Sequence, residues 1–471
     1  MNRETSTPTK DQHQDGLPIP RRYWSVISIW LALTMAVLDG AIANVALPTI
    51  ARELGASPAM SVWIINAYQL TITILLLPLA ALGDRLGYKC IYIPGLALFT
   101  LGSVGCALGG TLPLLIAARV FQGIGAACIM SMNAALVRAT YPSSMLGRGI
   151  GYNAMVLSMS AATGPTLAAL ILSLASWPWL FLINLPIGIA ALIVGRKALP
   201  DPAGHGQPFD WLSALLSAAM MGLIVFGAED YAREGNQLAF GLIIAGVVAG
   251  AILVWRERRD PRPLIPLDLL RIPIFALSIS TSVVSFAAQM LAYVALPFLF
   301  QSVLGRSVVA TGLLMTPWPI AVGIAAPVAG RLADRLNAGL LGGVGLAIFA
   351  AGLFLLSRLG ASPSNLDIVW RMAVCGLGFG LFQSPNNRTI VSAAPKPRSG
   401  AAGGMLATAR LLGQTAGAVA VGAAFHLAGV GVAPQLMLAA AIAALVAAGL
   451  SLTRLRVPGP TRVAVYRPIL D

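Results

Sequence analysis

Apolar runs of about twenty residues recur along almost the whole chain, and they constrain its fold more than any other feature. The chain has 471 residues, of which 57% are hydrophobic and only 10% are charged, whereas a soluble domain contains about 25% charged residues. A helix of about twenty residues is long enough to cross the roughly 30 Å hydrocarbon core of a bilayer. The pattern therefore predicts an all-α polytopic membrane protein.

Gly, Pro or charged residues separate fourteen such runs, as expected of turns at a membrane interface. Residues 1–24 are polar, and the run after them is too long for the core of a signal peptide, so we expect it to stay in the mature protein. The spans are expected near residues 25–47, 62–82, 90–108, 112–137, 150–173, 179–195, 211–228, 238–255, 274–302, 308–330, 338–357, 368–391, 402–427 and 433–453.

The distribution of Lys and Arg orients these spans. With the N-terminus inside, the tails and inner loops hold 24 of the 31 basic residues, the outer loops hold 4, and three arginines lie within spans. Cytoplasmic loops carry such an excess of Lys and Arg, so we expect both termini in the cytoplasm. The same bias explains the net charge of +14 without a nucleic-acid partner.

An internal repeat divides the chain. Leu82–Leu86 (LGDRL) reappears as Leu332–Leu336 (LADRL), at an offset of 250 residues, and Arg148 and Arg398 have the same offset. Duplicated halves are a device of secondary transporters. We therefore expect two six-helix bundles, at 25–196 and 257–453, a linker with two inserted helices at 197–256, and cytoplasmic tails at 1–24 and 454–471.

Several motifs connect the chain with a known family. Leu38–Pro48 has the pattern of a first-helix signature, Gly83–Lys89 that of a loop between the second and third helices, and Arg119–Gly125 that of a fourth helix. The fifth span follows the spacing of an antiporter motif at Gly151, Ser160, Gly164, Pro165, Ala168 and Ala169. These motifs resemble the major facilitator superfamily, specifically its fourteen-helix drug:proton antiporters, over nearly the whole chain. The sequence departs from that pattern at Ala80, Ser160 and Pro178.

Asp39 is the residue expected to couple transport to protons, because it is the one acidic residue deep within an expected span. An ionised Asp at mid-bilayer costs at least about 2.5 kcal/mol, so it should face a cavity or a partner. Its natural partner is Arg119 in the fourth span. Asp39 lies about 21 Å from the inner end of the first span, and Arg119 lies about 10 Å from the outer end of the fourth. In a hydrocarbon core about 30 Å thick, the two residues are therefore at nearly the same depth. The alternatives are a structural Asp39 and an Arg119 that bonds only backbone carbonyls.

Other polar and aromatic residues within the spans are candidates for a substrate cavity. They can hydrogen-bond substrate or join helices, and the two tryptophans can contact a lipophilic cation or simply pack in the core. They are Asn44, Gln122, Trp30, Trp318, Gln289 and Arg410. No carboxylate lies near Arg410 in its span, so its partner stays open.

The two charged turns are candidates for an inner gate, although topogenic charge alone would also explain them. A carboxylate near the start of a helix is stabilised by the positive end of that helix, and contacts of this kind can break and re-form between halves. The gate residues are Asp84, Arg85, Gly87, Asp334 and Arg335. Gly164 and Pro165 should bend the fifth span or pack it closely against a neighbour.

The resemblance implies a proton-coupled exporter of lipophilic, chiefly cationic, drugs or toxic compounds, working by alternating access in the bacterial cytoplasmic membrane. The alternatives are an exporter of a native metabolite, lipid or siderophore, and a non-transporting receptor or assembly protein. We expect no enzyme activity, since the sequence shows no nucleophile elbow, paired carboxylates or phosphate loop. We expect no cofactor and no metal; the partners are a small-molecule substrate, protons and the lipid bilayer, and the protein should work as a monomer.

Overall fold

The computed structural model describes residues 16–200, 210–234, 237–257, 267–333, 335–395 and 398–457. These residues form helices, with no strand among them. The longer helices are α1 (Arg21–Glu53), α3 (Trp63–Leu86), α4 (Tyr88–Ala107), α5 (Leu112–Thr140), α6 (Leu146–Leu174), α8 (Asn184–Ala198), α9 (Trp211–Glu234), α10 (Gln237–Glu257), α11 (Pro273–Phe298), α13 (Pro317–Leu332), α14 (Ala338–Ser357), α15 (Asn365–Ala393), α16 (Ser399–Ala428) and α17 (Ala433–Thr453).

Short helices join or extend these elements. They are α2 (Pro58–Ser61), η1 (Ser143–Met145), α7 (Trp179–Leu182), η2 (Leu267–Arg271), the π-helical turn η3 (Leu299–Val303), α12 (Val308–Met315), η5 (Val430–Val432) and η6 (Arg454–Arg456). Thirteen of the described helical segments are long and apolar enough to cross a membrane, and α9 adds a shorter apolar stretch, Trp211–Gly227. Thirteen of the fourteen expected spans fall on these segments, and the remaining one, near residues 211–228, falls on α9, whose apolar stretch is shorter.

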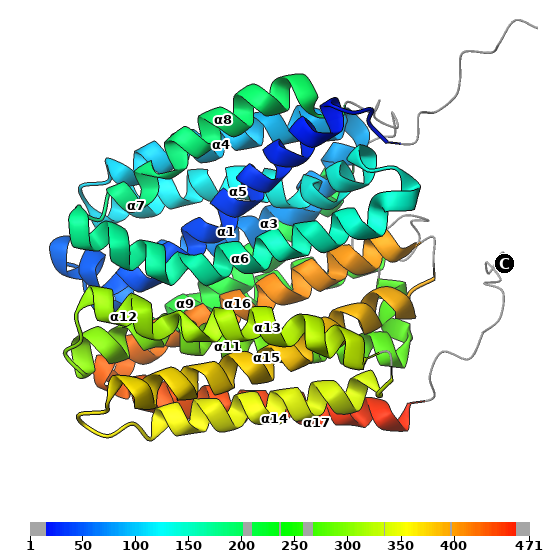
Figure 1. The fold of residues 1–471 in the computed structure, drawn as a ribbon. Helices are drawn as coiled ribbons and strands as arrows, with labels where there is room; N and C mark the ends of the chain where they lie inside the picture. Colours follow the sequence, from blue (N-terminus) through cyan, green and yellow to red (C-terminus); the bar gives the residue numbers. More distant parts are fainter. Residues whose placement is uncertain are drawn as a thin grey trace, which may run out of the picture.

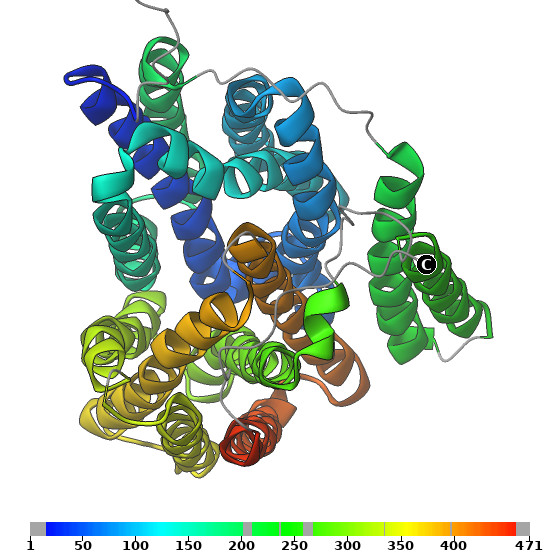
Figure 2. The ribbon, with the colours of Figure 1, turned by 90° about the vertical axis from the view of Figure 1, so that its right-hand side faces the viewer.

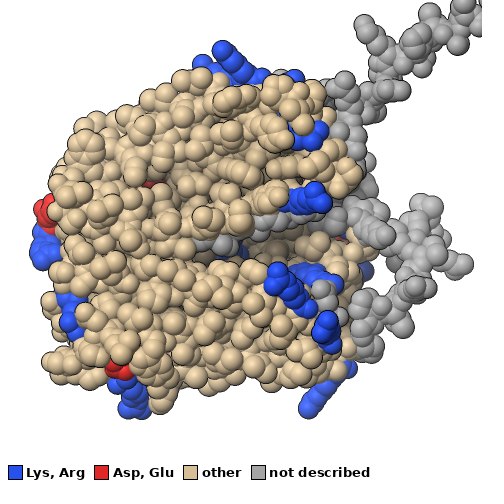
Figure 3. Space-filling model, in the orientation of Figure 1, with Lys and Arg blue, Asp and Glu red and all other residues tan. Residues whose placement is uncertain are grey.

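The long helices gather into two bundles that lie one above the other in Figure 1. The N-terminal bundle contains α1, α3, α4, α5, α6 and α8, and the C-terminal bundle contains α11, α14, α15, α16, α17 and the α12–α13 pair. Most of the Lys and Arg side chains visible in Figure 3 lie at the right-hand end of the molecule, where α1 begins, and we call this end the basic end. The surface there is hollowed between the two bundles.

The internal repeat is visible in the packing of two glycines. A Cβ atom on Gly125 of α5 would lie 2.3 Å from the Phe99 nitrogen and 2.6 Å from the Gly95 oxygen of α4. A Cβ atom on Gly378 of α15 would lie 2.3 Å from the Phe349 nitrogen and 2.6 Å from the Gly345 oxygen of α14. The two bundles therefore bring the same helix pair into the same close contact, which only glycine permits.

The inserted helices form a hairpin at one side of the molecule. α9 packs against α10, and also against α3 of one bundle and α16 of the other; Figure 2 shows the pair on the right, beside both bundles. Asp210 joins the ends of the hairpin, because its carboxylate accepts from the Ser213 amide at 3.1 Å and from Arg256 Nε at 3.1 Å. The hairpin thus covers part of the seam between the bundles.

The bundles are held together at the end opposite the basic end. Gln301 Nε2 donates to the Val45 oxygen at 3.0 Å, and the Thr166 and Thr316 hydroxyls share a hydrogen bond of 2.7 Å. A Cβ atom on Gly312 would lie 2.4 Å from the Pro165 oxygen, so α12 presses closely on α6. This end of the seam is closed by direct contact.

The described residues at the inner ends of the two expected tails belong to the helical bundles. α1 begins at Arg21, before the expected boundary at residue 24. Arg454 is 3% exposed and donates to Ser278 Oγ at 3.0 Å and to Asn386 Oδ1 at 2.8 Å, so it belongs to the C-terminal bundle. Residues 1–15, 201–209, 258–266 and 458–471 lie outside the described residues.

Candidate functional site

Asp39 and Arg119 form an ion pair in the interior of the N-terminal bundle. Asp39 lies on α1 and Arg119 on α5, and Arg119 Nη1 donates to Asp39 Oδ2. The side chains are 1% and 0% exposed, respectively. The pairing that the sequence left open is therefore present, and the alternative in which Arg119 bonds only carbonyls is wrong. A charge buried in this way is tolerable because its partner compensates it.

Two amides and a hydroxyl complete the surroundings of the Asp39 carboxylate. Gln122 Nε2 donates to Asp39 Oδ1 at 2.8 Å and Asn184 Nδ2 donates to the same oxygen at 2.9 Å. Gln122 Nε2 also donates to Ser103 Oγ at 2.8 Å, and Gln122 Oε1 accepts from Arg119 Nη1 at 2.6 Å. Both oxygens of the Asp39 carboxylate therefore have hydrogen-bond donors from other helices of the same bundle.

Arg119 connects the buried pair with the space between the bundles. Its Nε donates to the Ile64 oxygen at 3.0 Å, and its guanidinium lies 4.1 Å from the centre of the Tyr68 ring. Nη2 is buried without a hydrogen-bond partner among the described residues. Since Arg119 and Tyr68 also form part of the wall of a central cavity, this guanidinium contacts Asp39 on one side and the cavity on the other.

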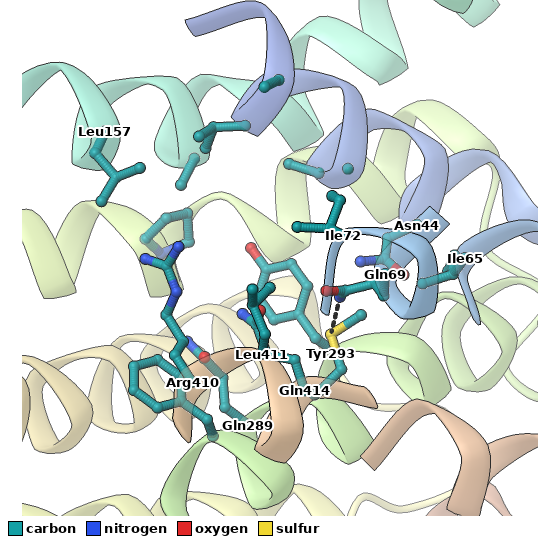
Figure 4. Close-up of a pocket in the computed structure, with 18 of the residues that line it drawn as sticks. Asn44, Ile65, Gln69, Ile72, Leu157, Gln289, Tyr293, Arg410, Leu411 and Gln414 are labelled. Carbon is teal, nitrogen blue, oxygen red and sulfur yellow. Dashed lines mark hydrogen bonds between the residues drawn. The ribbon is translucent and has the colours of Figure 1, made fainter. Parts of the chain in front are cut away.

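The central cavity lies between the two bundles, with residues of α1, α3, α5 and α6 on one side and of α11, α13, α15 and α16 on the other. Its empty volume is about 1260 Å³, including the part open to solvent. Figure 4 shows amide and tyrosine groups directed into it. Its polar lining residues are Asn44, Tyr68, Gln69, Arg119, Gln289, Tyr293, Gln383, Arg410 and Gln414.

Four of the residues expected at the cavity lie there: Asn44, Gln289, Trp318 and Arg410. The predictions for Trp30 and Gln122 were wrong. Trp30 does not line the cavity and packs edge-on against Tyr152, with ring centres 6.2 Å apart. Gln122 is fully buried and holds Asp39.

The position of Asp39 decides between two expectations. The sequence predicted that Asp39 would face either a cavity or a partner. Asp39 is not among the lining residues and lies behind Arg119, because the donors that satisfy it come from α5 and α8 within its own bundle. None of the described residues that line the cavity is Asp or Glu.

Sequence reasoning missed Asn184, Tyr68 and Gln383. Asn184 is a single polar residue in a long apolar run, Trp177–Gly188, and that isolation is the signal that could have identified it. Tyr68 donates its hydroxyl to the Ala36 oxygen at 3.0 Å, so its ring is held beside Arg119. Nothing in the local sequence distinguishes Gln383 from a residue that merely joins helices.

The charged turns lie at the basic end. Asp84 and Arg85 end α3, and Gly87 follows with a φ of 96°, a left-handed conformation that favours glycine. Tyr88 donates its hydroxyl to Asp84 Oδ1 at 3.0 Å, within the same bundle. Arg335 is exposed, and Asp334 lies outside the described residues. Their role as an inner gate stays a prediction.

Gly164 and Pro165 are the points at which α6 packs closely against α1 of its own bundle and against α12 of the other. A Cβ atom on Gly164 would lie 2.4 Å from Ala41 Cβ of α1. The Pro165 oxygen faces Gly312 of the other bundle at the close distance given above. The expectation of close packing is confirmed; a part in conformational exchange stays a prediction.

Two six-helix bundles around a central cavity, with an ion pair buried in one wall, define a membrane transporter for small molecules. The chain belongs to the major facilitator superfamily, since the family model of the Major Facilitator Superfamily matches residues 29–418. It is accordingly a multi-pass membrane protein of a transporter family and not an enzyme.

Several curated proteins are similar to the chain over most of its length. The uncharacterized transporter YebQ of Escherichia coli K12 is 52% identical over 447 residues, covering 94% of this chain and 98% of YebQ. The riboflavin transporter RibZ of Clostridioides difficile is 32% identical, covering 83% of this chain and 86% of RibZ. The tetracenomycin C resistance and export protein of Streptomyces glaucescens is 30% identical, with coverage of 88% and 79%.

A solved structure has a similar fold. The crystal structure of a bacterial homologue of the human lysosomal transporter Spinster, in an inward-facing and unoccupied conformation, matches with a TM-score of 0.67 at 14% identity. The match covers 93% of this chain and 98% of that chain.

Proposed function

We propose that the protein is a proton-coupled exporter of lipophilic organic compounds, acting as an antiporter in the bacterial cytoplasmic membrane, with both termini in the cytoplasm. The observation that carries this proposal is the ion pair of Asp39 with Arg119. A buried carboxylate is a place where a proton can be taken up and released, and its cationic partner belongs to the wall of the cavity.

A proton on Asp39 would change the charge of the cavity wall. With Asp39 ionised, the pair is neutral and Arg119 is held by the carboxylate, Gln122 and the Ile64 carbonyl. With Asp39 protonated, the same guanidinium carries an uncompensated charge next to the substrate space. An uncompensated charge in a low-dielectric region is costly, so the protonated and ionised forms should favour different arrangements of the bundles.

The relatives support export of organic compounds. A multidrug resistance protein, Stp of Mycobacterium tuberculosis, is 32% identical over 408 residues, and the Streptomyces protein above exports tetracenomycin C. By the same reasoning we propose that expression of this protein raises resistance to some toxic compounds and that a single chain forms the transport pathway.

The test is transport by purified protein in liposomes with an imposed pH gradient, using a panel of fluorescent lipophilic dyes. We expect dye movement against its own gradient, accompanied by proton movement in the opposite direction. Asp39→Asn should abolish the dependence on the pH gradient, whereas Glu53→Gln, which neutralises an exposed acidic residue on the same helix, should behave as wild type. Transport by Asp39→Asn that still depends on the pH gradient would refute proton coupling through this pair.

A further inference from the structure

Arg410 on α16 is a cavity-lining arginine that has no ion-pair or hydrogen-bond partner among the described residues. Its Nε atom is buried and has no hydrogen-bond partner, and no ion pair or hydrogen bond joins its guanidinium to any described residue. Figure 4 shows the side chain extending from α16 into the cavity, with Leu157 of α6 on the far side. Two other shielded arginines of this bundle are bonded, Arg371 to Asp367 and Arg454 to Asn386.

Placing the charge of Arg410 within a membrane span costs free energy, and no described residue of the C-terminal bundle offsets that cost with a hydrogen bond or an ion pair. A charged residue within a membrane span is expensive unless it faces a water-filled cavity or a partner, and such residues mark substrate pathways. The helix that carries Arg410 is firmly placed, since Gly413 and Gly417 press against the backbone of α11. Cβ atoms on them would lie 2.3 Å from the Val283 oxygen and 2.4 Å from the Ala287 oxygen, respectively. The neighbouring face of α16 therefore holds Arg410 toward the cavity.

The other lining residues match a molecule with one charged end. Gln289 and Gln414 line the same cavity as Arg410 and offer amide donors and acceptors. Phe286, Phe379 and Trp318 form an aromatic wall on the same side, with Phe286 and Phe379 rings 5.3 Å apart. The Trp318 indole nitrogen is also buried, has no hydrogen-bond partner in the part of the chain that the structure describes, and is a further donor for an acceptor group.

We propose that Arg410 is the recognition site for an acidic group, and that the substrates are lipophilic organic anions with a carboxylate or a similar acidic group on an aromatic body. This identification of the substrate class rests on the proposed transport function. With a monoanion bound, the charges of Asp39, Arg119, Arg410 and the substrate add to zero, so the loaded cavity is neutral. A guanidinium binds a carboxylate through two parallel hydrogen bonds, which an uncharged or cationic analogue cannot reproduce.

The test is binding of three probes that share one aromatic body: 1-pyrenebutyrate, 1-pyrenebutanol and 1-pyrenebutylammonium. Purified protein is placed in nanodiscs of neutral phosphatidylcholine, and energy transfer from tryptophan to pyrene is measured, with empty nanodiscs subtracted. We expect the carboxylate to bind at least about tenfold more tightly than the alcohol, as a hydrogen bond to a charged group implies, and the ammonium to bind most weakly.

The variants assign this preference to one side chain. Arg410→Gln should remove the preference for the carboxylate while leaving binding of the alcohol unchanged, and Arg410→Lys should retain part of it. Arg358→Gln removes an arginine at the far end of α14 and should behave as wild type. Equal binding of the three probes by wild type, tighter binding of the ammonium, or a carboxylate preference that persists in Arg410→Gln would each overturn the proposal.

The binding measurement uses no pH gradient, so it is independent of proton coupling. If the carboxylate preference depends on Arg410 but no probe moves in the liposome assay, the anion site stands and the proposed transport function fails. If dyes move with the pH gradient but wild type binds the three probes equally, the transport function stands and the anion site fails. If Arg410→Gln does not fold, the comparison of the three probes on wild-type protein still tests whether the cavity prefers the carboxylate.

Discussion

At the scale of single residues, the Asp39 carboxylate accepts hydrogen bonds from two amides in addition to its ion pair with Arg119. Asp39 accepts from Arg119, Gln122 and Asn184, which belong to α5 and α8. In the second repeat Arg371 precedes Gly376 and Gly378 much as Arg119 precedes Gly123 and Gly125 in the first, yet Arg371 pairs with Asp367 on its own helix. The residue 250 positions after Asp39 is Gln289, on the cavity wall. The two bundles thus share a scaffold but not their chemistry.

A first prediction concerns Gln122. Gln122→Leu removes a donor from the Asp39 carboxylate, and loss of one buried hydrogen bond costs about 1–3 kcal/mol. We therefore expect Gln122→Leu to unfold at a lower temperature and to transport more slowly under an imposed pH gradient. The measurements are thermal unfolding in nanodiscs and the initial transport rate in liposomes. Gln435→Leu, at an exposed position on α17, is the control, and wild-type unfolding and transport by Gln122→Leu would contradict this role.

At the scale of helices, small residues allow neighbouring helices to pack closely against each other. Gly164 brings α6 onto α1 at Ala41, and Gly312 brings α12 onto α6 at Pro165. These contacts lie on both sides of α6, so α6 connects the N-terminal bundle with the C-terminal one. The hairpin of α9 and α10 makes a second connection along the seam, since α9 packs on α3 and α16.

A second prediction concerns the contact of α6 with α1. In Gly164→Val the added Cβ atom would lie 2.4 Å from Ala41 Cβ, and overpacking of this kind typically costs about 1–3 kcal/mol. We expect protein that still reaches the membrane but has lost most of its transport activity. Gly323→Val on α13 is the matched control, because a Cβ atom there meets nothing within 4 Å. Equal activity of the two variants would argue against a part for Gly164 in exchange.

A third prediction concerns the hairpin. Desolvation by burial raises the pKa of Asp210, but hydrogen bonds from Ser213 and Arg256 outweigh it and lower the pKa to about 2. Because the pKa is lowered in the folded state, the stabilisation is present above the ordinary value of 3.8 and is lost as the pH falls through about 2. Asp210→Ala should destabilise α9 by about 1 kcal/mol, the usual cost of losing a helix N-cap.

Thermal unfolding of Asp210→Ala and wild type in nanodiscs checks this, with the difference expected to stay constant between pH 5 and 8. Asp210→Asn keeps the cap but not the charge and should lie between them. A difference that grows within this pH range would mean that another group is responsible.

At the scale of the whole molecule, the bundles contact each other closely at the end opposite the basic end. Gln301 bonds the Val45 carbonyl there, and Thr166 bonds Thr316. Nearer the cavity the cross-bundle contacts are weaker, for example Gln69 Nε2 to Met290 Sδ at 3.7 Å. In the proposed alternating-access cycle these contacts would break while the charged turns at the basic end come together, so the hydrogen bonds at this end would set the balance between the two states.

A fourth prediction follows for Gln301. Gln301→Ala removes its hydrogen bond to Val45 and should shift the population toward a form open at that end. Asn44, on the cavity wall, is replaced by Cys in a background without the exposed Cys90, and a membrane-impermeant maleimide is added from the outer side. We expect labelling at least about fivefold faster with Gln301→Ala, for a loss of about 1 kcal/mol. Labelling at the same rate would show that this bond does not hold the outer side closed.

Much of the architecture followed from the sequence. Periodic apolar runs located the helices, because a membrane span must be long and apolar, and the repeat of Asp84 and Asp334 predicted two related halves. Asp39 and Arg119 could be paired from depth alone, since helix rise fixes how far each residue lies from its helix end. Trp30 and Gln122 were misplaced, because depth does not tell which way a side chain points around a helix.

From the amino-acid sequence one could infer the class of fold, the position of the one deep carboxylate and the absence of a second one in the later spans. The packing of the helices in three dimensions places Arg119 between Asp39 and the cavity, and it brings Arg410 to the cavity with no partner among the described residues. The physical reason is that hydropathy and helix rise act along one chain segment. The rotation and contact of helices depend instead on close packing between segments distant in sequence, such as Gly413 against α11. That packing determines which charge reaches the cavity.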